Sequence, residues 1–544
     1  MNTHDSLSFF ESHYTWIAGY NRNVIRYGDK LAMVSPKENK EWTYSEFNSE
    51  VNRLSNALMQ DGFQRGEVIM LLLPNCPAFA FSYVAAHKIH GVCCPVNYRL
   101  SSGELSEYLE NSRPKALLFD DTYSDIVLMA TRLSSFCPKR LISVGGATVG
   151  DIISFEDYVC HSSDEEPPYT CEYNIYDETT RIYTSGTTGK PKGIPLMSIN
   201  ELLSAHDQMI NLSISHKDVT MNTTPWFHRG GLHSTGPCPA FYAGATIIVM
   251  EKFEPEVALK YVQKYKVTFF VGVPTVLDQL ADLQEHFNYD LTSLRGISSM
   301  GSPLDRSRCI RYQKILTPNI YNAYGISEMH AVTLLQPSDL PEYAGTAGGP
   351  CGEIDVRVVK TYDTHRAEPD DMVADDGIEV GEVIASSPAY SPYCYFDNEE
   401  ETDRRYYNGY FYSNDLAVWD KKKYITIVGR RDDLIISSGE NIYPNEVEAI
   451  LNNHPKVKES IVTSVPDEIR GQIVAAYVVR EDDTLTVAEL DAFCKQSPYL
   501  ANFKRPRYYR FVDDIPYTAL GKKHHTKIRE IALWDFNNAV LTKV

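Results

Sequence analysis

The 544 residues contain 43% hydrophobic and 23% charged side chains, which is the composition of an ordinary soluble globular protein, and they provide material for two or more domains. The formal net charge of −20 disfavours non-specific binding to nucleic acid or to an anionic membrane surface. An anionic ligand therefore has to be held by a local group of cationic side chains and backbone N–H groups.

Eleven cysteines are scattered along the chain without a CxxC pair, which favours free thiols in a reducing compartment over a disulfide scaffold or a zinc site. The N-terminus lacks the basic and apolar regions of a signal peptide. The longest apolar stretch, residues 68–86, contains Pro74 and Pro77 and does not predict a membrane span. The last residues, Leu-Thr-Lys-Val, carry no peroxisomal or lipidation signal. We expect a cytoplasmic protein with no integral membrane segment.

Residues 42–120 alternate between helix and strand patterns. Phe47, Val51, Leu54 and Leu58 recur at spacings of four, three and four, which marks one apolar helix face. Further helices are expected at residues 78–90 and after Ser101 or Ser102, either of which can cap a helix. Strands are expected at residues 68–73, 92–96, 116–119, 246–250, 269–273 and 296–300. The first strand is continuously apolar, as in parallel strands buried on both faces, so the alternation predicts parallel sheets covered by helices.

The chain changes character twice after this region. Residues 156–175 are acidic and contain prolines, which predicts a surface linker. After residue 430 the pattern becomes that of a compact α+β fold, with strands expected at residues 424–428, 460–465 and 473–479 and a helix at residues 445–451. We place a domain boundary near Asp432, which divides the chain into domains 1–431 and 432–544.

Residues 183–193 read Tyr-Thr-Ser-Gly-Thr-Thr-Gly-Lys-Pro-Lys-Gly. Glycines let a backbone approach a ligand closely, so that successive N–H groups can face an anion, and the hydroxyls and lysines add donors and charge suited to a polyphosphate. The stretch is not a Walker A loop, because the spacing GxxxxGK[ST] fails. By composition alone, such a run is more often a solvated loop.

Six further stretches resemble functional motifs, although three of them have an ordinary structural interpretation: core packing for residues 223–233, a simple turn for residues 322–328 and a solvated lysine for residues 516–523. They are residues 223–233 (Thr-Thr-Pro-Trp-Phe-His-Arg-Gly-Gly-Leu-His), 300–303 (Met-Gly-Ser-Pro), 322–328 (Asn-Ala-Tyr-Gly-Ile-Ser-Glu), 409–417 (Gly-Tyr-Phe-Tyr-Ser-Asn-Asp-Leu-Ala), 429–446, and 516–523 (Pro-Tyr-Thr-Ala-Leu-Gly-Lys-Lys).

Together with residues 183–193, these stretches resemble the signature motifs of the acyl-adenylate-forming superfamily, which includes acyl-CoA synthetases, adenylation domains of peptide synthetases, and luciferases. The resemblance covers residues 40–525. It implies an α/β fold with a large N-terminal domain of parallel-rich sheets layered with helices, a β-barrel-like subdomain, and a small, mobile α+β C-terminal domain.

The resemblance also implies a nucleotide site. Tyr324 would stack on adenine, Asn322 would bind its amino group, and Ser327, where the family usually has Thr, would approach the α-phosphate. Glu328 would ligate Mg²⁺, a role that suits a carboxylate beside phosphate oxygens. The complete set expected at ATP or AMP is Thr184, Ser185, Gly186, Thr187, Thr188, Gly189, Lys190, Lys192, Gly301, Ser302, Pro303, Asn322, Ala323, Tyr324, Gly325, Ser327, Asp415 and Arg430.

An acid-binding pocket is expected next to this site. By resemblance, residues 223–233 border an acid tunnel, and His228 occupies a motif position with a catalytic role. Peptide-synthetase domains usually place Asp there, so His228 favours a carboxylic acid without an α-ammonium group. The expected pocket residues are Trp226, Phe227, Arg229, His233 and Met300. They predict an apolar pocket of limited depth for a short- to medium-chain, aromatic or alicyclic acid, with no role assigned to Arg229 or His233.

The C-terminal motifs imply a moving domain. Asp415 would bind the ribose hydroxyls, and Asn414 replaces the usual Gly before it, but Asn tolerates a left-handed backbone, so we expect the turn to persist. Asp432 would be the hinge, and Lys522 would reach the active site during adenylation. Ser438, Gly439 and Glu440 would meet the pantetheine of coenzyme A. The basic run at residues 504–507 would meet CoA phosphates or form a solvated face.

The predicted function is that of an AMP-forming acyl-CoA synthetase that uses ATP, Mg²⁺ and coenzyme A, forms an acyl-adenylate and pyrophosphate, and then transfers the acyl group to CoA. The cycle is reversible in principle. The first alternative is an acyl-AMP ligase that serves a separate carrier protein. An oxidative luciferase is less favoured, and a catalytically silent ligand sensor would be expected to have lost Lys522 or Glu328. The expected partners are small molecules, and a homodimer is allowed.

Overall fold

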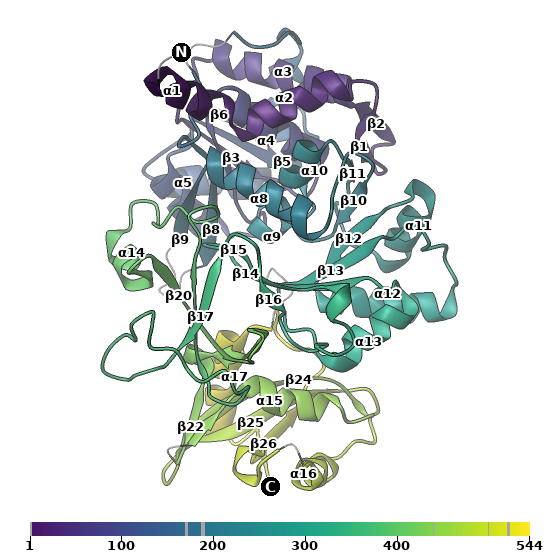
Figure 1. Ribbon diagram of the computed structural model, residues 1–544, viewed down its shortest axis with the longest axis vertical. Coiled ribbons are helices and arrows are strands. Elements are labelled where there is room, and N and C mark those ends of the chain that lie inside the picture. Colours follow the sequence, from purple (N-terminus) through teal and green to yellow (C-terminus); the bar gives the residue numbers. More distant parts are fainter. Residues whose placement is uncertain (1–2, 169–171, 186–190, 439, 499, 519–522) are drawn as a thin grey trace. The chain divides into compact units, whose positions relative to one another are not determined.

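The structure is a computed structural model that describes residues 3–168, 172–185, 191–438, 440–498, 500–518 and 523–544. The backbone divides into two compact units (Figure 1). The first unit comprises Met1–Ala344, Pro350–Asp355 and Ala385–Phe411, and the second comprises Gly345–Gly349, Val356–Ile384 and Tyr412–Val544. The boundary expected near Asp432 lies inside the second unit, and its functional meaning is taken up as a proposal below.

A seven-stranded sheet in the first unit has the order β7-β6-β5-β3-β4-β8-β9. The expected strand at residues 68–73 is β3, and it is parallel to both of its neighbours. Met70 and Leu72 face a core that includes α5 and α6, while Ile69 and Leu71 are buried on the other face. The strands are β3 (Val68–Leu72), β4 (Val92–Pro95), β5 (Ala116–Asp120), β6 (Arg140–Val144), β7 (Ile152–Ser154), β8 (Glu178–Ser185) and β9 (Pro191–Met197). Burial on both faces explains the continuous apolar run, as predicted.

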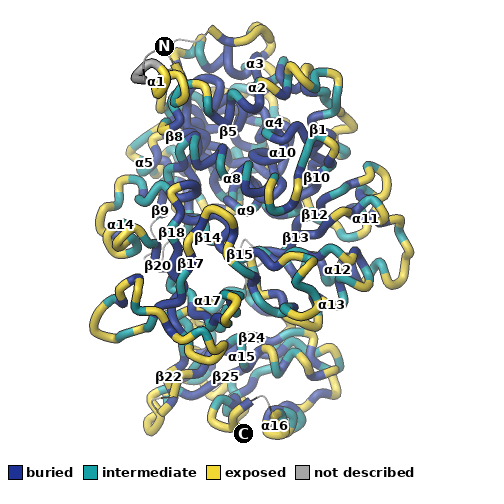
Figure 2. Tube along the Cα trace, viewed as in Figure 1, coloured by how far each residue is buried: buried dark blue, intermediate teal, exposed yellow. Residues whose placement is uncertain are grey.

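Helices cover this sheet where the sequence expects them. The apolar face of α3 is fully buried, and Thr43 and Glu46 form a capping box at its start. The helix α4 is buried all round, which Figure 2 shows in dark blue. Ser101, rather than Ser102, caps α5. The helices of the first unit are α1 (Thr3–His13), α2 (Trp16–Arg26), α3 (Tyr44–Gln60), α4 (Pro77–Lys88), α5 (Ser102–Ser112), α6 (Ser124–Leu133), α7 (Phe155–Val159), α8 (Ser198–Asn211), α9 (Arg229–His233), α10 (Pro237–Ala243), α11 (Pro255–Tyr265), α12 (Pro274–His286), α13 (Arg306–Ile315) and α14 (Glu399–Arg405).

The surface linker expected at residues 156–175 is confirmed at residues 160–166, which form no helix or strand and are exposed or half-buried, and is wrong at its two ends. Helix α7 occupies its beginning, and Ile175 is buried. Glu166 forms an ion pair of 2.6 Å with Lys88, whose side chain is fully buried, and accepts a hydrogen bond from Asn48. A buried ammonium group is strongly destabilising without a counter-charge, so Glu166 of this stretch serves as the counter-charge of Lys88.

A nine-stranded sheet has the order β16-β15-β14-β13-β12-β10-β11-β1-β2. Its centre, from β11 through β10, β12 and β13 to β14, is parallel. The strands are β1 (Leu31–Ser35), β2 (Lys40–Thr43), β10 (Val219–Asn222), β11 (Thr246–Ile248), β12 (Phe269–Gly272), β13 (Gly296–Met300), β14 (Ile320–Ile326), β15 (His330–Leu335) and β16 (Gly349–Pro350). The strands predicted near residues 246, 269 and 296 are confirmed as β11, β12 and β13.

Two smaller sheets complete the fold. A five-stranded half-barrel confirms the expected barrel-like subdomain and contains β17 (Asp355–Val359), β18 (Gly381–Ser386), β19 (Tyr406–Tyr407), β20 (Tyr410–Trp419) and β21 (Ile425–Arg430). A six-stranded sheet with its own apolar cores forms the C-terminal α+β fold. It contains β22 (Ile435–Ser437), β23 (Glu440–Ile442), β24 (Val457–Asp467), β25 (Gly471–Arg480), β26 (Tyr508–Phe511) and β27 (Thr542–Lys543), with helices α15 (Pro444–Asn452), α16 (Val487–Gln496) and α17 (His525–Asn537).

Two further observations concern the described residues as a whole. Their ten cysteines are all free thiols, as the scattered spacing predicts. None of their helices combines the length and apolar character needed to cross a membrane.

Candidate active site

Three of the predicted motifs meet at one edge of the nine-stranded sheet. The parallel register pairs Asn222 with Val271, Gly272 with Ser299, and Met300 with Ala323. Residues 223–233 and 300–303 therefore follow β10 and β13 at the same edge at which residues 322–328 end β14. The carboxyl edge of a parallel sheet is the usual place for a ligand.

The backbone at this edge has two positions that require glycine. Gly301 directly follows β13 with φ +82°, a left-handed conformation. At Gly325 a Cβ atom would lie 2.4 Å from the His330 carbonyl oxygen, because β14 and β15 pair closely with a register shift there. Tyr324, which is half-buried, and Asn322, which is buried, therefore lie at this sheet edge on a sterically constrained backbone.

Glu328, the expected metal ligand, is buried just beyond β14. Its carboxylate accepts a hydrogen bond from the Tyr395 hydroxyl. Burial and the charge of Glu328 raise the pKa of Tyr395, so this hydroxyl remains a donor at any physiological pH. A carboxylate fixed in this way is a hard oxygen ligand, and Mg²⁺ commonly uses one or two carboxylates together with substrate phosphates, so the residues present fit the ion.

Arg229 binds the segment that directly precedes Glu328. Its guanidinium group is buried and donates hydrogen bonds to the Ser327 carbonyl at 2.6 Å and to the Tyr390 carbonyl at 2.5 Å. Burial lowers the pKa of Arg229 to about 10, which leaves it protonated at neutral pH. The cation therefore fixes the residue that precedes Glu328.

His233 belongs to a buried ion pair. Its Nε2 lies 2.6 Å from Glu201 on α8, and both side chains are completely buried. Tyr83 donates to the same carboxylate oxygen at 2.9 Å. Burial alone would raise the pKa of Glu201, but the imidazole of His233 outweighs it and holds this pKa well below its ordinary value. The described contacts of Arg229 and His233 are thus with protein groups.

The three apolar residues expected in the acid pocket are all buried. The Trp226 ring lies 5.5 Å from that of Phe79, and the Phe227 ring stands perpendicular to Tyr98 at 5.4 Å. A Cβ atom at Gly230 would lie 2.9 Å from the Met300 sulfur. The neighbouring His228 ring lies 4.1 Å from that of Phe227. Phe227 and His228 are thus in contact with each other, and Met300 lies against Gly230 of the same motif.

The phosphate-loop residues Gly186, Thr187, Thr188, Gly189 and Lys190 lie outside the described residues, as does the side chain of Ser185. The loop joins β8 to β9, and Thr184 pairs with Lys192 across these antiparallel strands. Lys192 itself is buried and forms an ion pair of 2.6 Å with Glu401 on α14, which also binds Arg404. The one described lysine of the motif therefore anchors the strands that hold the loop.

The expected ribose-binding residues face each other in the second unit. Asp415 and Arg430 pair across β20 and β21, with Arg430 Nε 3.2 Å from the Asp415 carboxylate. Asn414 has φ +67°, which confirms the left-handed turn expected there. Its N–H donates to Glu382 at 2.9 Å. The substitution of Asn for Gly thus preserves the local conformation.

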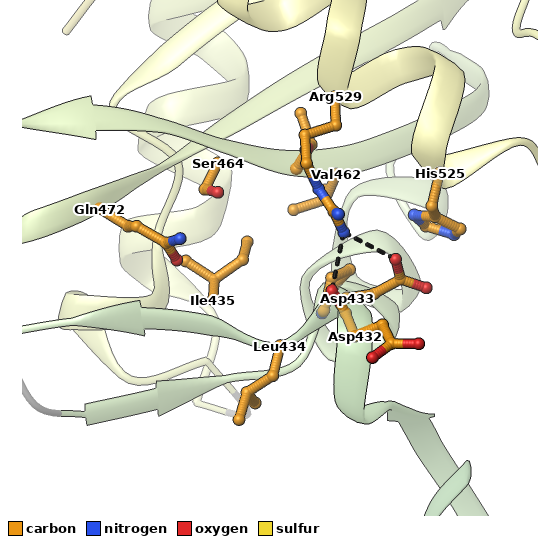
Figure 3. Close-up of a pocket in the computed structure, with 11 residues that line it drawn as sticks. Asp432, Asp433, Leu434, Ile435, Val462, Ser464, Gln472, His525 and Arg529 are labelled. Carbon is orange, nitrogen blue, oxygen red and sulfur yellow. Dashed lines mark hydrogen bonds and ion pairs between the residues drawn. The ribbon is translucent and has the colours of Figure 1, made fainter. Parts of the chain in front are cut away.

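Figure 3 shows the surroundings of the expected hinge, Asp432, in a short 3₁₀ turn (Arg431–Asp433). Arg529 on α17 donates to the Asp432 carbonyl at 2.9 Å and to the Asp433 carboxylate at 2.8 Å. On the other side, Arg431 donates to the Tyr362 carbonyl at 2.6 Å. Consecutive residues are therefore anchored to different partners.

The remaining C-terminal predictions are placed only in part. Ser438 and Glu440 are exposed at the turn between β22 and β23, whereas Gly439 and Lys522 lie outside the described residues. In the basic run, Arg505 is buried beside Asp491 and Lys504 pairs with Glu446. Arg505 and Lys504 are therefore held by carboxylates of the protein. The predicted alternative of a purely solvated basic face is wrong for these two residues.

Comparison with known proteins identifies the family. The model of the AMP-binding enzyme family matches residues 20–392, and that of the AMP-binding enzyme C-terminal domain matches residues 446–522. The chain belongs to the AMP-binding enzyme family. Within it, the chain is an AMP-forming acid–thiol ligase.

Two curated relatives of this AMP-binding enzyme are 30% identical to it. They are a feruloyl-CoA synthase of Amycolatopsis sp, matched over 88% of this chain and 92% of its own, and a 2-succinylbenzoate–CoA ligase of Geobacillus sp. (strain WCH70), matched over 92% and 94%. The o-succinylbenzoate coenzyme A synthetase of Bacillus subtilis, solved with ATP and a magnesium ion, is 25% identical with a TM-score of 0.80 over 94% of this chain and 98% of its own. An anthranilate CoA ligase with anthranoyl-AMP shares the fold, with a TM-score of 0.87 at 23% identity over 97% and 99%.

Four residues of this AMP-binding enzyme escaped the sequence analysis: Asn75, Tyr395, Glu401 and Arg529. Asn75 accepts from the Trp226 N–H at 2.7 Å and donates to the Thr224 carbonyl. The sequence does mark Asn75, because it is a polar residue between two prolines directly after an apolar strand. The other three bind partners that are distant in the chain, and no local pattern marks them.

Proposed function

We propose that the enzyme is an AMP-forming acyl-CoA synthetase with two half-reactions. In the first, a carboxylate oxygen attacks the α-phosphate of ATP, the bond to pyrophosphate breaks, and an acyl-adenylate forms. In the second, the sulfur of coenzyme A attacks the acyl carbonyl and AMP leaves. The observation that carries the proposal is the meeting of the nucleotide motif, the acid motif and the fixed Glu328 carboxylate at one sheet edge.

Within this proposal each group has a defined task. Tyr324 and Asn322 hold adenine, while Asp415 and Arg430 hold the ribose and phosphate. Glu328 holds Mg²⁺, which when bound neutralises charge on the phosphates. Positioning of the two anions and positive charge at the α-phosphate supply most of the acceleration. Lys522 contributes that charge during the first half-reaction.

The second half-reaction requires the lysine to be exchanged for the CoA-facing loop that contains Ser438 and Glu440. A pivot at Asp432 supports this exchange. Because Arg431 is tied to the Tyr362 carbonyl and Asp432 to Arg529, a rotation of the backbone between them would leave both anchors intact. The C-terminal fold, residues 432–544, would then turn as a body.

The acid is proposed to be aromatic, alicyclic or of short to medium chain length. The Met300 sulfur lies against Gly230 and the Trp226 ring packs on Phe79, which supports a shallow apolar pocket. The names of the similar proteins, a feruloyl-CoA synthase and 2-succinylbenzoate–CoA ligases, favour an acid with a ring.

The decisive experiment is pyrophosphate release from ATP and Mg²⁺ over a panel of ferulate, 2-succinylbenzoate, anthranilate, octanoate and palmitate, each with and without CoA. Sustained turnover that depends on CoA supports the proposal and names the acid. Release that CoA leaves unchanged supports the ligase for a separate carrier protein. A strong preference for palmitate contradicts the shallow pocket.

A further inference from the structure

A second pocket, of about 320 Å³, lies in the first unit among α2, α8 and α10, which pack against one another. It shares no residue with the site described above. Its lining is dominated by six basic or aromatic side chains: Arg22, Arg26, Tyr27, His206, His216 and Tyr242. A chain with 72 acidic and 52 basic residues has thus gathered cationic groups in one hollow.

The two arginines of this pocket form no ion pair with a described residue. Arg22 and Arg26 are exposed one turn apart on α2, an arrangement in which like charges repel. Among the described residues that line the pocket there is no Asp or Glu. The adjoining loop carries one carboxylate, Asp218, but it is buried and paired with Arg295. An anion that enters would therefore meet two guanidinium groups and no carboxylate from the described lining residues.

Two aromatic rings of the pocket pack directly against the backbone at two glycines. At Gly19 on α2 a Cβ atom would lie 1.9 Å from the Tyr242 ring, so only glycine lets this ring lie against the helix. The Tyr242 hydroxyl is 3.1 Å from His206 Nε2. At Gly244, with φ +78°, a Cβ atom would lie 2.7 Å from the Tyr27 ring.

The Tyr27 ring is in turn stacked on another side chain of the pocket. It lies 5.0 Å from the His216 ring, with 9° between the two planes. Planar side chains therefore form both walls, and hydroxyl and imidazole groups supply further donors beside the guanidinium pair.

We propose that this pocket binds a small phosphate-bearing molecule that carries an aromatic ring. Guanidinium groups match phosphate oxygens in a bidentate geometry, and aromatic side chains favour stacking on a planar ligand group. The volume is at the lower end of the range for small-molecule sites, which limits the ligand to a compact one.

The test uses the full-length protein and phenyl phosphate, whose binding is measured by calorimetry both without nucleotide and with saturating ATP, because ATP itself carries a ring and phosphates. We expect one site on the wild type and at least about tenfold weaker binding in the double variant R22E/R26E, since two charge-assisted contacts become repulsive. The matched control is R132E, because Arg132 is an exposed arginine in the last turn of α6, as Arg26 is in that of α2. Binding to R132E should equal that of the wild type.

A milder variant, R22Q/R26Q, guards against misfolding, with ATP binding and the melting temperature as checks. It should also weaken phenyl phosphate binding while both checks stay at wild-type values. Inorganic phosphate and phenol, measured separately, should each bind more weakly than phenyl phosphate. The proposal is overturned if the wild type binds no phenyl phosphate in either condition, if R22Q/R26Q binds it as tightly, or if inorganic phosphate binds equally well.

Discussion

At the scale of single residues, the Tyr395 hydroxyl holds the Glu328 carboxylate by a hydrogen bond, and one conservative substitution can remove it. Tyr395→Phe keeps the ring and deletes the donor to the carboxylate. Groups that orient a metal ligand typically contribute 10- to 100-fold to metal affinity, so we expect the Mg²⁺ concentration for half-maximal pyrophosphate release to rise about tenfold or more. The measurement is a Mg²⁺ titration at saturating ATP and acid.

Tyr393→Phe is the matched control for this change, because the Tyr393 hydroxyl bonds Ser386 rather than Glu328. It should leave the Mg²⁺ titration unchanged. An unchanged titration in Tyr395→Phe itself would contradict the assignment of Glu328 to the metal or that of Tyr395 to its support.

At the scale of elements, the pair of Glu201 and His233 joins α8 to α9 in the interior. The pKa of Glu201 is depressed in the folded protein, so its contribution to stability is present above the ordinary value of 4.5 and is lost as the pH falls below it. Breaking a buried pair costs about 3–5 kcal/mol, and we expect Glu201→Gln to lower the free energy of unfolding by that order at pH 7. Denaturant unfolding from pH 7 to pH 3 would show a difference from wild type that stays nearly constant down to about pH 4.5 and shrinks below it.

Glu107→Gln, at an exposed position on α5, is the reference for this experiment and should change the unfolding free energy little at any pH. A Glu201→Gln protein as stable as the wild type at pH 7 would show that the ion pair contributes nothing.

The contacts of Arg529 on α17 with the 3₁₀ turn give a second prediction at this scale. Arg529→Gln removes the cation that holds Asp432 and Asp433, so rotation would no longer be confined to one linkage. We expect acyl transfer to CoA to slow about tenfold or more, with acyl-adenylate formation changed much less. Single-turnover assays of each half-reaction would separate the two, and Lys527→Gln on the same helix is the control. Equal losses in both half-reactions would argue against a hinge function.

The element scale also shows how far the sequence leads. Strands such as β3 and helices such as α3 follow from local periodicity, because burial on one or two faces leaves its mark on neighbouring residues. The left-handed turn at Asn414 follows from residue type. The ion pair of Lys192 with Glu401 could not be predicted, since it joins residues 209 positions apart. Nor could the partners of Arg229, because backbone carbonyls carry no residue signature.

At the scale of the whole molecule, the proposed cycle assigns its two half-reactions to different arrangements of the chain. Lys522→Ala should slow acyl-adenylate formation at least about 100-fold, because it removes charge that stabilises the transition state. Transfer from preformed acyl-adenylate to CoA should remain close to the wild-type rate. Lys527→Ala, at a nearby lysine paired with Glu530, should affect neither step. Loss of both steps alike in Lys522→Ala would contradict domain alternation.

The buried anchors of α9 have a consequence for redesign of acid selectivity. Trp226 and Phe227 are buried aromatic rings, so exchanging them for smaller or larger side chains costs cavity or overpacking energy but removes no ion pair. Arg229 and His233, only a few residues further on, hold the loop before Glu328 and the interior carboxylate of Glu201. Under the proposed function, a library that varies the first two positions and keeps the last two fixed should change acid selectivity while the sheet edge around Glu328 stays intact.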